Sequence, residues 1–450
     1  MLALVYIFSS CNGIATNGGS SLSDSSAGSS GSAISDMQSK ETSSVTQSNE
    51  SGSPLSETGS SASQSSAVSI HSSLNQSSGS AANTPAPTAT KPAQPTAMPV
   101  NEYYSSQIGM WYCVWWDSEV KDSYYYEHHW LKETRITPAR FGYYATDDID
   151  KLTYDLNYFN KIGIDYLLLD DTNNHAADSG NIASHINSVF KTADSIGAAG
   201  SPELAFAGGS PLLNNNEPGM LAEMDIFHAY SVKYPDTYYR WKGKPLFVNF
   251  NMPINFKFKD PKDRFTIRNS CGHTSESLSY AAKYNLTATG LYGWVFDTQY
   301  LASEVYGINP GWSRSHNDFN WTGPAPKSRE NSAKYTRMWL EAIKTNPEQI
   351  VVASWNDHAE ETGIEAVILK EAIEGREDEY KNPYMYEQIT EGYLALKTGY
   401  LEGFYYRAEN SVQIYRYASK KLSAVSSVPD DKVLIVVPDD YFEWAGISRG

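Results

Sequence analysis

Two acidic residues, Asp357 and Glu360, lie three positions apart just after an apolar run in the segment QIVVASWNDHAEETGIEA, residues 349–366. The run at residues 350–353 is rich in β-branched side chains, which is typical of a strand buried on both faces. If a helical turn follows, both acids face the same way. A rigid strand end can hold such a pair over a pocket, where one carboxyl donates a proton and the other accepts one. The segment therefore predicts an acid–base pair at the edge of an active site.

The same spacing also has a purely structural interpretation. Asn356 or Asp357 could be the N-cap of a helix, with Glu360 close to its third position, which is an ordinary capping arrangement. The spacing alone does not decide between the two interpretations, and they do not exclude each other.

Eight apolar runs of strand length recur along the chain after residue 100. They are residues 109–116, 164–170, 204–207, 245–250, 265–270, 288–296, 305–309 and 350–354. Helical periodicity is clearest at residues 148–161 and 328–345, and weaker at residues 181–195, 219–230 and 275–284. Residues 371–403 should be helical and close the structure. This alternation predicts an α/β protein with a closed (β/α)8 TIM barrel.

Polar and aromatic side chains follow most of these runs. They are Trp115, Trp116, Asp170, Asp171, Asn251, Trp294, Asp297, Trp312, Trp355 and Asn356. In such a barrel the carboxyl ends of the strands converge on one mouth. Indoles stack on sugar rings, while acids and amides bind hydroxyl groups, so we expect these residues to bind a polysaccharide. Acids also end strands by capping the next loop, and this alternative stays open for Asp170.

The composition argues against a nucleic-acid partner. The chain of 450 residues has 35 Lys and Arg against 52 Asp and Glu, and its net charge of −17 repels phosphate backbones. With 32 Tyr and 11 Trp it has many side chains suited to sugar rings, although a large core also needs them. The three cysteines show no zinc-binding spacing, so we expect no metal and no other cofactor. We expect a monomer.

The composition divides the chain into four parts. Residues 1–11 are apolar, too short to span a bilayer as a helix, and similar to the apolar part of a signal peptide. Residues 12–100 are rich in Ser, Gly, Ala, Thr and Pro and predict a disordered linker, because they cannot bury enough apolar surface to fold. Residues 101–410 hold the predicted barrel. Residues 411–450 form a C-terminal extension, with a peripheral strand expected at 433–437.

The end of the leader resembles a loose bacterial lipoprotein cleavage box, Phe8-Ser9-Ser10-Cys11, in which Cys11 is acylated. The basic residues that usually precede such a segment are missing, so either the start codon is misplaced or this interpretation fails. Lipidation of Cys11 would attach the protein to a membrane without spanning it. We therefore expect a secreted or cell-surface bacterial protein that meets a membrane only through this anchor.

The segment WNDHAEET resembles the W-N-D-x-x-E-S signature of glycoside hydrolase family 71, the α-1,3-glucanases. The longer SWNDHAEETGIEA is similar to the S-x-N-E-W-x-E-G-T-x-I-E motif of family 99, the endo-α-mannanases and endo-α-mannosidases. Upstream, the sequences NPGW at residues 309–312 and WLEA at residues 339–342 fit the region ahead of that motif. The resemblance runs from about residue 108 to residue 365 and is specific in its C-terminal third.

This resemblance implies a (β/α)8 endo-acting glycosidase for an α-linked polysaccharide. Glu360 aligns with the acid that protonates the departing oxygen, and Asp357 aligns with the base. The base is an Asp in family 71, whereas His358 and Glu361 depart from the family 99 motif, so the resemblance favours an α-1,3-glucan-like substrate. Two alternatives stay open. One is an endo-α-mannanase or mannosidase of the family 99 type, and the other is a surface lipoprotein that binds glycans without cleaving them.

Overall fold

The computed structural model describes residues 102–121, 129–131, 136–172, 181–209, 217–250, 259–270, 292, 304–313, 326–370 and 382–445. All of them belong to one of the two units into which the chain divides. The expected leader and the linker at residues 12–100 lie outside the described residues, as does the expected helix at residues 275–284. The predicted boundaries of these parts therefore stay predictions.

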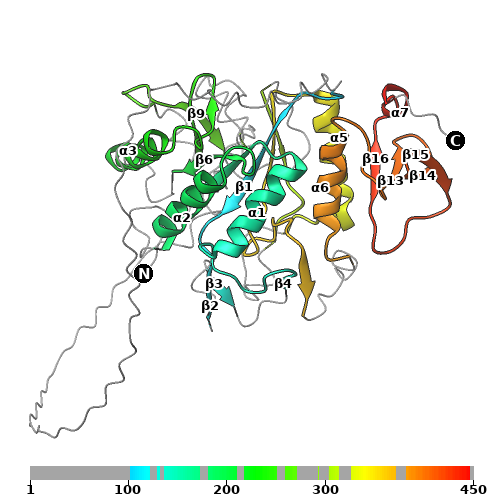
Figure 1. Ribbon diagram of the computed structural model, residues 1–450, viewed down its shortest axis with the longest axis horizontal. Coiled ribbons are helices and arrows are strands. Elements are labelled where there is room, and N and C mark those ends of the chain that lie inside the picture. Colours follow the sequence, from blue (N-terminus) through cyan, green and yellow to red (C-terminus); the bar gives the residue numbers. More distant parts are fainter. Residues whose placement is uncertain are drawn as a thin grey trace, which may run out of the picture. The chain divides into compact units, whose positions relative to one another are not determined.

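A mixed α/β fold is built on one large sheet (Figure 1). In spatial order its parallel strands are β10 (Val305–Ile308), β11 (Gln349–Val352), β1 (Gln107–Cys113), β5 (Tyr166–Asp170), β6 (Glu203–Gly208), β8 (Lys244–Phe250) and β9 (Thr266–Ser270). The short β7 (Arg240–Trp241) pairs antiparallel with β8. Each parallel strand coincides with one predicted apolar run, within a few residues. β5 and β11 are buried along their whole length, as helices on one face and a packed interior on the other require.

The sheet curls so far that its two outer strands approach each other. Arg268 of β9 forms an ion pair with Glu304, which directly precedes β10 at the other end of the strand order. Inside the curl, the rings of Trp111 on β1 and Phe250 on β8 lie 5.8 Å apart, although two strands separate β1 from β8. Flat sheets do not allow such contacts, so the strands wrap around a common interior.

Tyr292 is the one described residue of the expected strand at residues 288–296. Its amide donates to the carbonyl of Asn269 in β9 (2.8 Å), and its hydroxyl donates to Glu304 (3.3 Å). The residue therefore lies between the two outer strands of the described sheet, β9 and β10.

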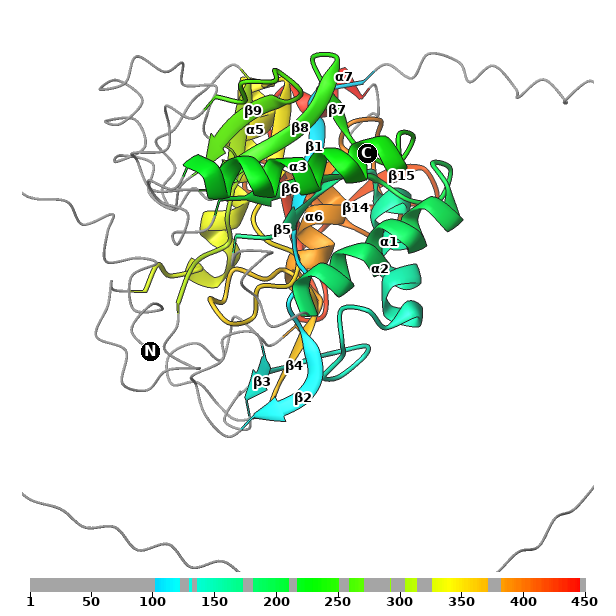
Figure 2. The same cartoon turned by 90° about the vertical axis from the view of Figure 1, so that its left-hand side faces the viewer.

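Helices follow several strands as the periodicity predicts. They are α1 (Ile149–Ile162), α2 (Asn181–Ile196), α3 (Glu217–Lys233), α5 (Ala333–Thr345), which follows the 3-10 turn η4 (Glu330–Ser332), and α6 (Met385–Ala395). Asp148 caps α1 by accepting from the amides of Asp150 and Lys151, and Gly163 ends it with a φ of 94°. α1 and α2 lie side by side in both views (Figures 1 and 2).

The long helix expected at residues 371–403 is shorter in the structure. Residues 371–381 are outside the described part, and α6 ends at Ala395. The chain then turns, with positive φ at Gly399 and Gly403 (154° and 85°), which glycine adopts without a steric penalty.

A smaller sheet near the C-terminus lies beside α5 and α6 (Figure 1). Its strands are β13 (Tyr405–Ala408), β14 (Ile414–Ala418), β15 (Lys421–Val425) and β16 (Leu434–Val437), in the order β15-β14-β13-β16, and α7 (Tyr441–Trp444) follows. β16 is the strand expected at residues 433–437. The hydroxyl of Tyr393 in α6 donates to the carbonyl of Val436 (2.9 Å), which joins this sheet to the helix layer.

Two further strand pairs lie at the edge of the described structure. β2 (Asp117–Lys121) pairs with β3 (His129–Leu131), and β4 (Ile136–Pro138) pairs with β12 (Val367–Leu369). Among the described helices, none has both the length and the apolar character that crossing a bilayer demands.

Candidate active site

Residues 355–365, here called the carboxyl loop, leave β11 at the carboxyl end of the sheet. The Asp357 carboxylate accepts from the amide of Glu360 (2.9 Å), and its main-chain carbonyl accepts from the amides of Thr362 and Gly363 (3.1 and 3.0 Å). Ile364 returns to Ser354 through an N–H···O bond of 3.0 Å. The segment is thus a closed turn rather than the start of a regular helix. The Asp357 side chain does stabilise this turn, as the structural interpretation predicts.

Glu360 is partly buried and faces the segment that follows β10. Its carboxylate oxygen Oε2 accepts from the indole Nε1 of Trp312 (3.0 Å), and its carbonyl accepts from the amide of Ser313 (3.0 Å). Two residues predicted from the sequence to share a site, Trp312 and Glu360, are therefore in direct contact.

The charge of Asp170 acts on the same buried thiol as the charges of the two acids of the carboxyl loop. It is the last residue of β5 and pairs in register with Cys113, the last residue of β1. The Cys113 thiol is buried, and burial together with the charges of Asp357, Asp170 and Glu360 raises its pKa well above the usual value. The charges of three carboxyl groups thus act on the thiol at the end of β1.

Burial, assisted by neighbouring acids, changes the protonation of Asp170. Burial and the smaller effect of the Asp357 and Asp171 charges raise the pKa of Asp170 to about 7, against two hydrogen bonds from Thr172. Near neutral pH this carboxyl can therefore hold a proton while a neighbouring carboxyl is ionised, which is the condition for acid–base chemistry.

Asp171 points to a different neighbour. It is buried, its amide donates to the carbonyl of Ala207 (2.8 Å), and its charge acts on Glu223 of α3. Burial raises the pKa of Glu223 well above its usual value, and Asp171 adds to this effect, while the amide of Gly209 opposes it with a bond of 3.0 Å. Sequence reasoning missed Glu223, because nothing distinguishes it from other acids of a surface helix.

Three of the expected site residues lie in the packed interior. The Asn356 side chain bonds both the amide and the carbonyl of Cys113 (2.8 and 3.0 Å). The indole of Trp116 donates to the Asn356 carbonyl (2.9 Å), and the Trp355 ring lies 4.8 Å from that of Phe159 in α1. These contacts tie the carboxyl loop to β1 and α1.

The remaining predicted positions are less informative. Trp115 is buried next to Trp116, with ring centroids 6.4 Å apart. Asn251, Trp294, Asp297 and Cys11 lie outside the described residues.

The carboxyl loop is also held from the side of α5. Arg329 donates through Nη2 to the carbonyls of Glu361 (2.6 Å) and Gly363 (2.8 Å). A Cβ on Gly363 would lie 3.3 Å from His358 Nδ1 and from the Trp355 carbonyl, so the turn is tightly packed. The acids are therefore presented by a rigid element.

A buried ion pair behind the loop was not predicted. Lys151 of α1 contacts Asp155 and Glu365, and His358 contacts the same glutamate. A signal was present, because Lys151 and Asp155 lie four residues apart on the stripe of α1 that also carries the core residue Phe159. Within the described part of the chain, no group of three or more His, Cys, Asp or Glu residues has the geometry to hold a metal ion.

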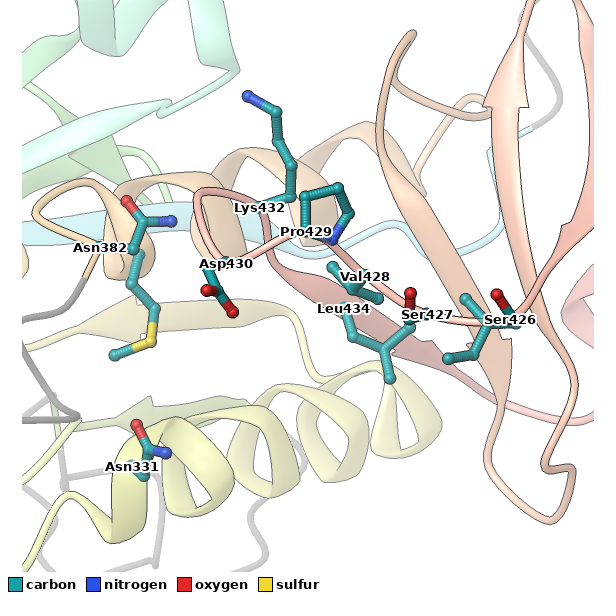
Figure 3. A pocket seen from close by; sticks show the side chains of 11 residues that line it. Asn331, Asn382, Ser426, Ser427, Val428, Pro429, Asp430, Lys432 and Leu434 are labelled. Atoms are coloured by element: carbon teal, nitrogen blue, oxygen red, sulfur yellow. The ribbon is translucent and has the colours of Figure 1, made fainter.

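A cavity of about 640 Å³ lies elsewhere, between the start of α5, α6 and the C-terminal sheet (Figure 3). Its lining includes Asn331, Asn382, Met385 and residues 426–430. None of the residues predicted to do chemistry lines it, so it is separate from the carboxyl cluster.

No family model and no curated protein matches this sequence. Solved structures do match. The endo-alpha-mannosidase of glycoside hydrolase family 99 from Bacteroides thetaiotaomicron gives a TM-score of 0.46 and 15% identity over 64% of this chain and 96% of that chain. The same enzyme in complex with bis-tris-propane gives 0.43 and 16% with the same coverage. A glycoside hydrolase-like protein gives 0.40 and 13% over 64% and 94%. The solved structures to which this chain is similar are thus an endo-alpha-mannosidase and a glycoside hydrolase-like protein.

Proposed function

We propose that this protein is an endo-acting glycoside hydrolase that cleaves an α-linked polysaccharide of the α-1,3-glucan type. The observation that carries the proposal is that the charges of Asp170, Asp357 and Glu360 all act on the buried Cys113 thiol, near the carboxyl ends of β1, β5 and β11. Glycoside hydrolysis needs one protonated and one ionised carboxyl beside the scissile bond. A crowded group of acids at the carboxyl edge of a parallel sheet provides both states.

We also propose that the curled sheet closes into a (β/α)8 barrel through residues 288–296. The bond from the Tyr292 amide to Asn269 supports this closure, because it lies on the free side of β9. The Arg268–Glu304 ion pair supports it too, because it spans the remaining distance to β10. The carboxyl cluster would then lie at the mouth of the barrel.

The hydrogen bonds of the two acids of the loop support separate roles for them. Asp357 accepts from the Glu360 amide (2.9 Å) and from the Thr362 hydroxyl (3.4 Å), and such bonds favour the ionised form. Asp357 is therefore the base. Glu360 is the acid, and Trp312 fixes its orientation by bonding one carboxylate oxygen (3.0 Å). Glu360 protonates the departing glycosidic oxygen while Asp357 removes a proton from the nucleophile.

A neutral sugar polymer fits this site better than a charged one. The acids, together with the net charge of −17, would repel an anionic glycan. The aspartate at position 357 favours glucan, because the base of the α-1,3-glucanase motif is also an aspartate. We further propose that a lipid on Cys11 and the linker at residues 12–100 attach a monomeric enzyme to a bacterial cell surface.

The test measures release of reducing ends from α-1,3-glucan, α-mannan and α-1,6-glucan, together with retention on each polymer in an affinity gel. We expect release of oligosaccharides of several lengths from α-1,3-glucan. Release from α-mannan alone would instead indicate an endo-α-mannanase. Retention without release would indicate a glycan-binding protein that does not cleave its ligand. If the protein is not retained on any polymer and releases no reducing ends, the proposal is contradicted.

A further inference from the structure

Four ionisable side chains form a buried cluster behind the carboxyl loop, here called the ion cluster. They are Lys151 and Asp155 of α1 and His358 and Glu365 of the loop, and each is at most 5% exposed. Lys151 Nζ lies 3.0 Å from Glu365 Oε1 and also contacts Asp155, while His358 Nε2 lies 3.0 Å from Glu365 Oε2. One cation therefore links α1 to the far end of the loop.

Two tyrosines extend the ion cluster to neighbouring elements. Tyr144 donates to Glu365 (2.7 Å), and Tyr112 of β1 donates to Asp155 (3.0 Å). The amide of the Asn356 side chain donates to the Tyr144 hydroxyl (3.3 Å), which connects the cluster to the residue directly before Asp357. Both ends of the loop are therefore attached to the same network.

The charges of the ion cluster are strongly stabilised. Burial alone would raise the pKa of Glu365, but Lys151, His358 and Tyr144 lower it to about 2. Burial would lower the pKa of Lys151, but Asp155 and Glu365 raise it above the usual value. Burial raises the pKa of Asp155 to about 6 despite Lys151 and Tyr112. The Lys151–Glu365 pair is thus ionised at neutral pH.

A second ion pair flanks this network without entering it. Arg140 bonds both carboxylate oxygens of Glu387 in α6 (2.6 Å each), and Glu387 also accepts from the amide of Ala366 (2.7 Å). The residue after Glu365 is therefore held separately, by α6.

A buried ion pair stabilises a fold no better than apolar residues of the same size, but it fixes geometry, and removing one partner is costly. Here the pair joins α1 to the loop that carries both proposed catalytic acids. Misplacing reacting groups by about 1 Å can lower a rate by about 100-fold. The position of the ion pair therefore suits control of loop geometry.

We propose that Lys151 is a positioning residue for the proposed hydrolysis. Through Glu365 and His358 it holds the carboxyl loop in the conformation that directs Asp357 and Glu360 at the glycosidic bond. Lys151 acts only through these residues and does not touch the substrate. The inference rests on the proposed function, because it assigns Asp357 and Glu360 to catalysis.

The first experiment compares Lys151→Met with Arg268→Met in the full chain. Arg268 is a matched control, because it also belongs to a largely buried ion pair but contacts Glu304 ahead of β10, away from the carboxyl ends. We expect kcat to fall about 10- to 100-fold in Lys151→Met with KM within about threefold, and to stay within about threefold of wild type in Arg268→Met. Equal kcat values in the two folded variants would overturn the proposal.

The second experiment uses pH dependence, which a loss of packing alone would not change. Without Lys151, ionised Glu365 has no adjacent lysine, so its pKa should rise into the working range. As the pH rises from about 5 to about 8, we expect the kcat of Lys151→Met to fall about tenfold relative to the kcat of the wild type. Adding Glu365→Gln should remove this fall. An unchanged pH profile in the single variant would contradict the proposal.

A third measurement keeps the two proposals distinguishable. Amide hydrogen exchange at Glu360, Thr362 and Gly363 reports the bonds within the carboxyl loop and needs no substrate. We expect faster exchange there in Lys151→Met than in Arg268→Met. If the wild-type chain cleaves no polymer, the proposed function fails, and equal exchange in the two variants would then overturn the positioning role as well.

Discussion

Buried acids at the two ends of the central sheet have pKa values shifted in opposite directions. At the amino end of β10, Glu304 meets Arg268 and Lys242, and although burial raises its pKa, these cations lower it below the usual value. At the carboxyl end of β5, burial raises the pKa of Asp170 to about 7, and the charge of Asp357 contributes to the rise. Like charges that crowd together oppose folding, whereas paired charges support it. The arrangement at the amino end therefore supports folding, whereas the arrangement at the carboxyl end opposes it and lies where we propose the active site.

The largest expected effect tests the carboxyl end. Asp357→Asn and Glu360→Gln should each lower kcat by about 10³-fold, because each removes one half of the acid–base pair. Thermal unfolding should stay unchanged or shift upward, since one of several crowded charges is neutralised. Kinetics on the cleaved polymer and calorimetry measure both. Unchanged rates in both variants would remove the catalytic assignment.

The next prediction concerns pH. The Asp170 carboxyl has a pKa of about 7 in the folded protein, against an ordinary aspartate value of 3.8 in the unfolded chain. As the pH rises, the unfolded chain therefore loses this proton before the folded protein does. The free energy of unfolding falls by up to about 4 kcal/mol between about pH 4 and about pH 7 and does not change further at higher pH. Asp170→Asn should remove this loss while its amide oxygen still accepts from Thr172. Urea unfolding at pH 4.5 and 7.5 compares the wild type with Asp170→Asn. If the free energy of unfolding depends equally on pH in both proteins, Asp170 is not in a buried, acidic environment.

The amino end should respond in the opposite way. Glu304→Gln leaves Arg268 without its buried partner and should lower the free energy of unfolding by about 3 kcal/mol. At a temperature where the variant is folded, kcat should equal that of the wild type. Chemical denaturation and steady-state kinetics provide the two readouts. If Glu304→Gln loses activity but not stability, the acid at the amino end does not act mainly on folding, and the contrast between the two ends is wrong.

The smallest expected effect refines the role of Trp312. Trp312→Phe keeps an aromatic ring but removes the N–H that bonds Glu360 (3.0 Å). A hydrogen bond to a neutral group contributes about 0.5 to 1.5 kcal/mol, so kcat should fall by up to about tenfold. Trp444→Phe, in the C-terminal helix α7, is the control. If both variants match the wild type, the indole does not orient the acid.

Much of the fold could be predicted because buried parallel strands are continuous apolar runs. The runs at residues 164–170 and 350–354 correspond to β5 and β11 for this reason. The C-terminal sheet could not be predicted beyond β16, since β14 and β15 are short, are mostly half-buried or exposed, and show no clear alternation. The helix expected at residues 371–403 was too long, because the chain leaves the helical path after Ala395, ahead of the positive φ of Gly399.

The proximity of site residues could be predicted where they are close in sequence, but not where they come from distant segments. Asp357 and Glu360 share one turn, so their spacing indicates their proximity. The sequence cannot show which way a tryptophan points at a strand end, and Trp355 turns toward α1. The Lys151–Glu365 contact joins distant segments, and only the position of Lys151 on a buried stripe indicated it.

The placement of β1 between β5 and β11 has a consequence for synthesis on the ribosome. β5 is made soon after β1, but the other neighbour, β11, emerges only when most of the chain has been translated. Until then β1 exposes an unpaired edge, and such edges recruit strands from other chains. Chains that stop before residue 349 should therefore aggregate, and the three carboxyl groups can come together only near the end of translation.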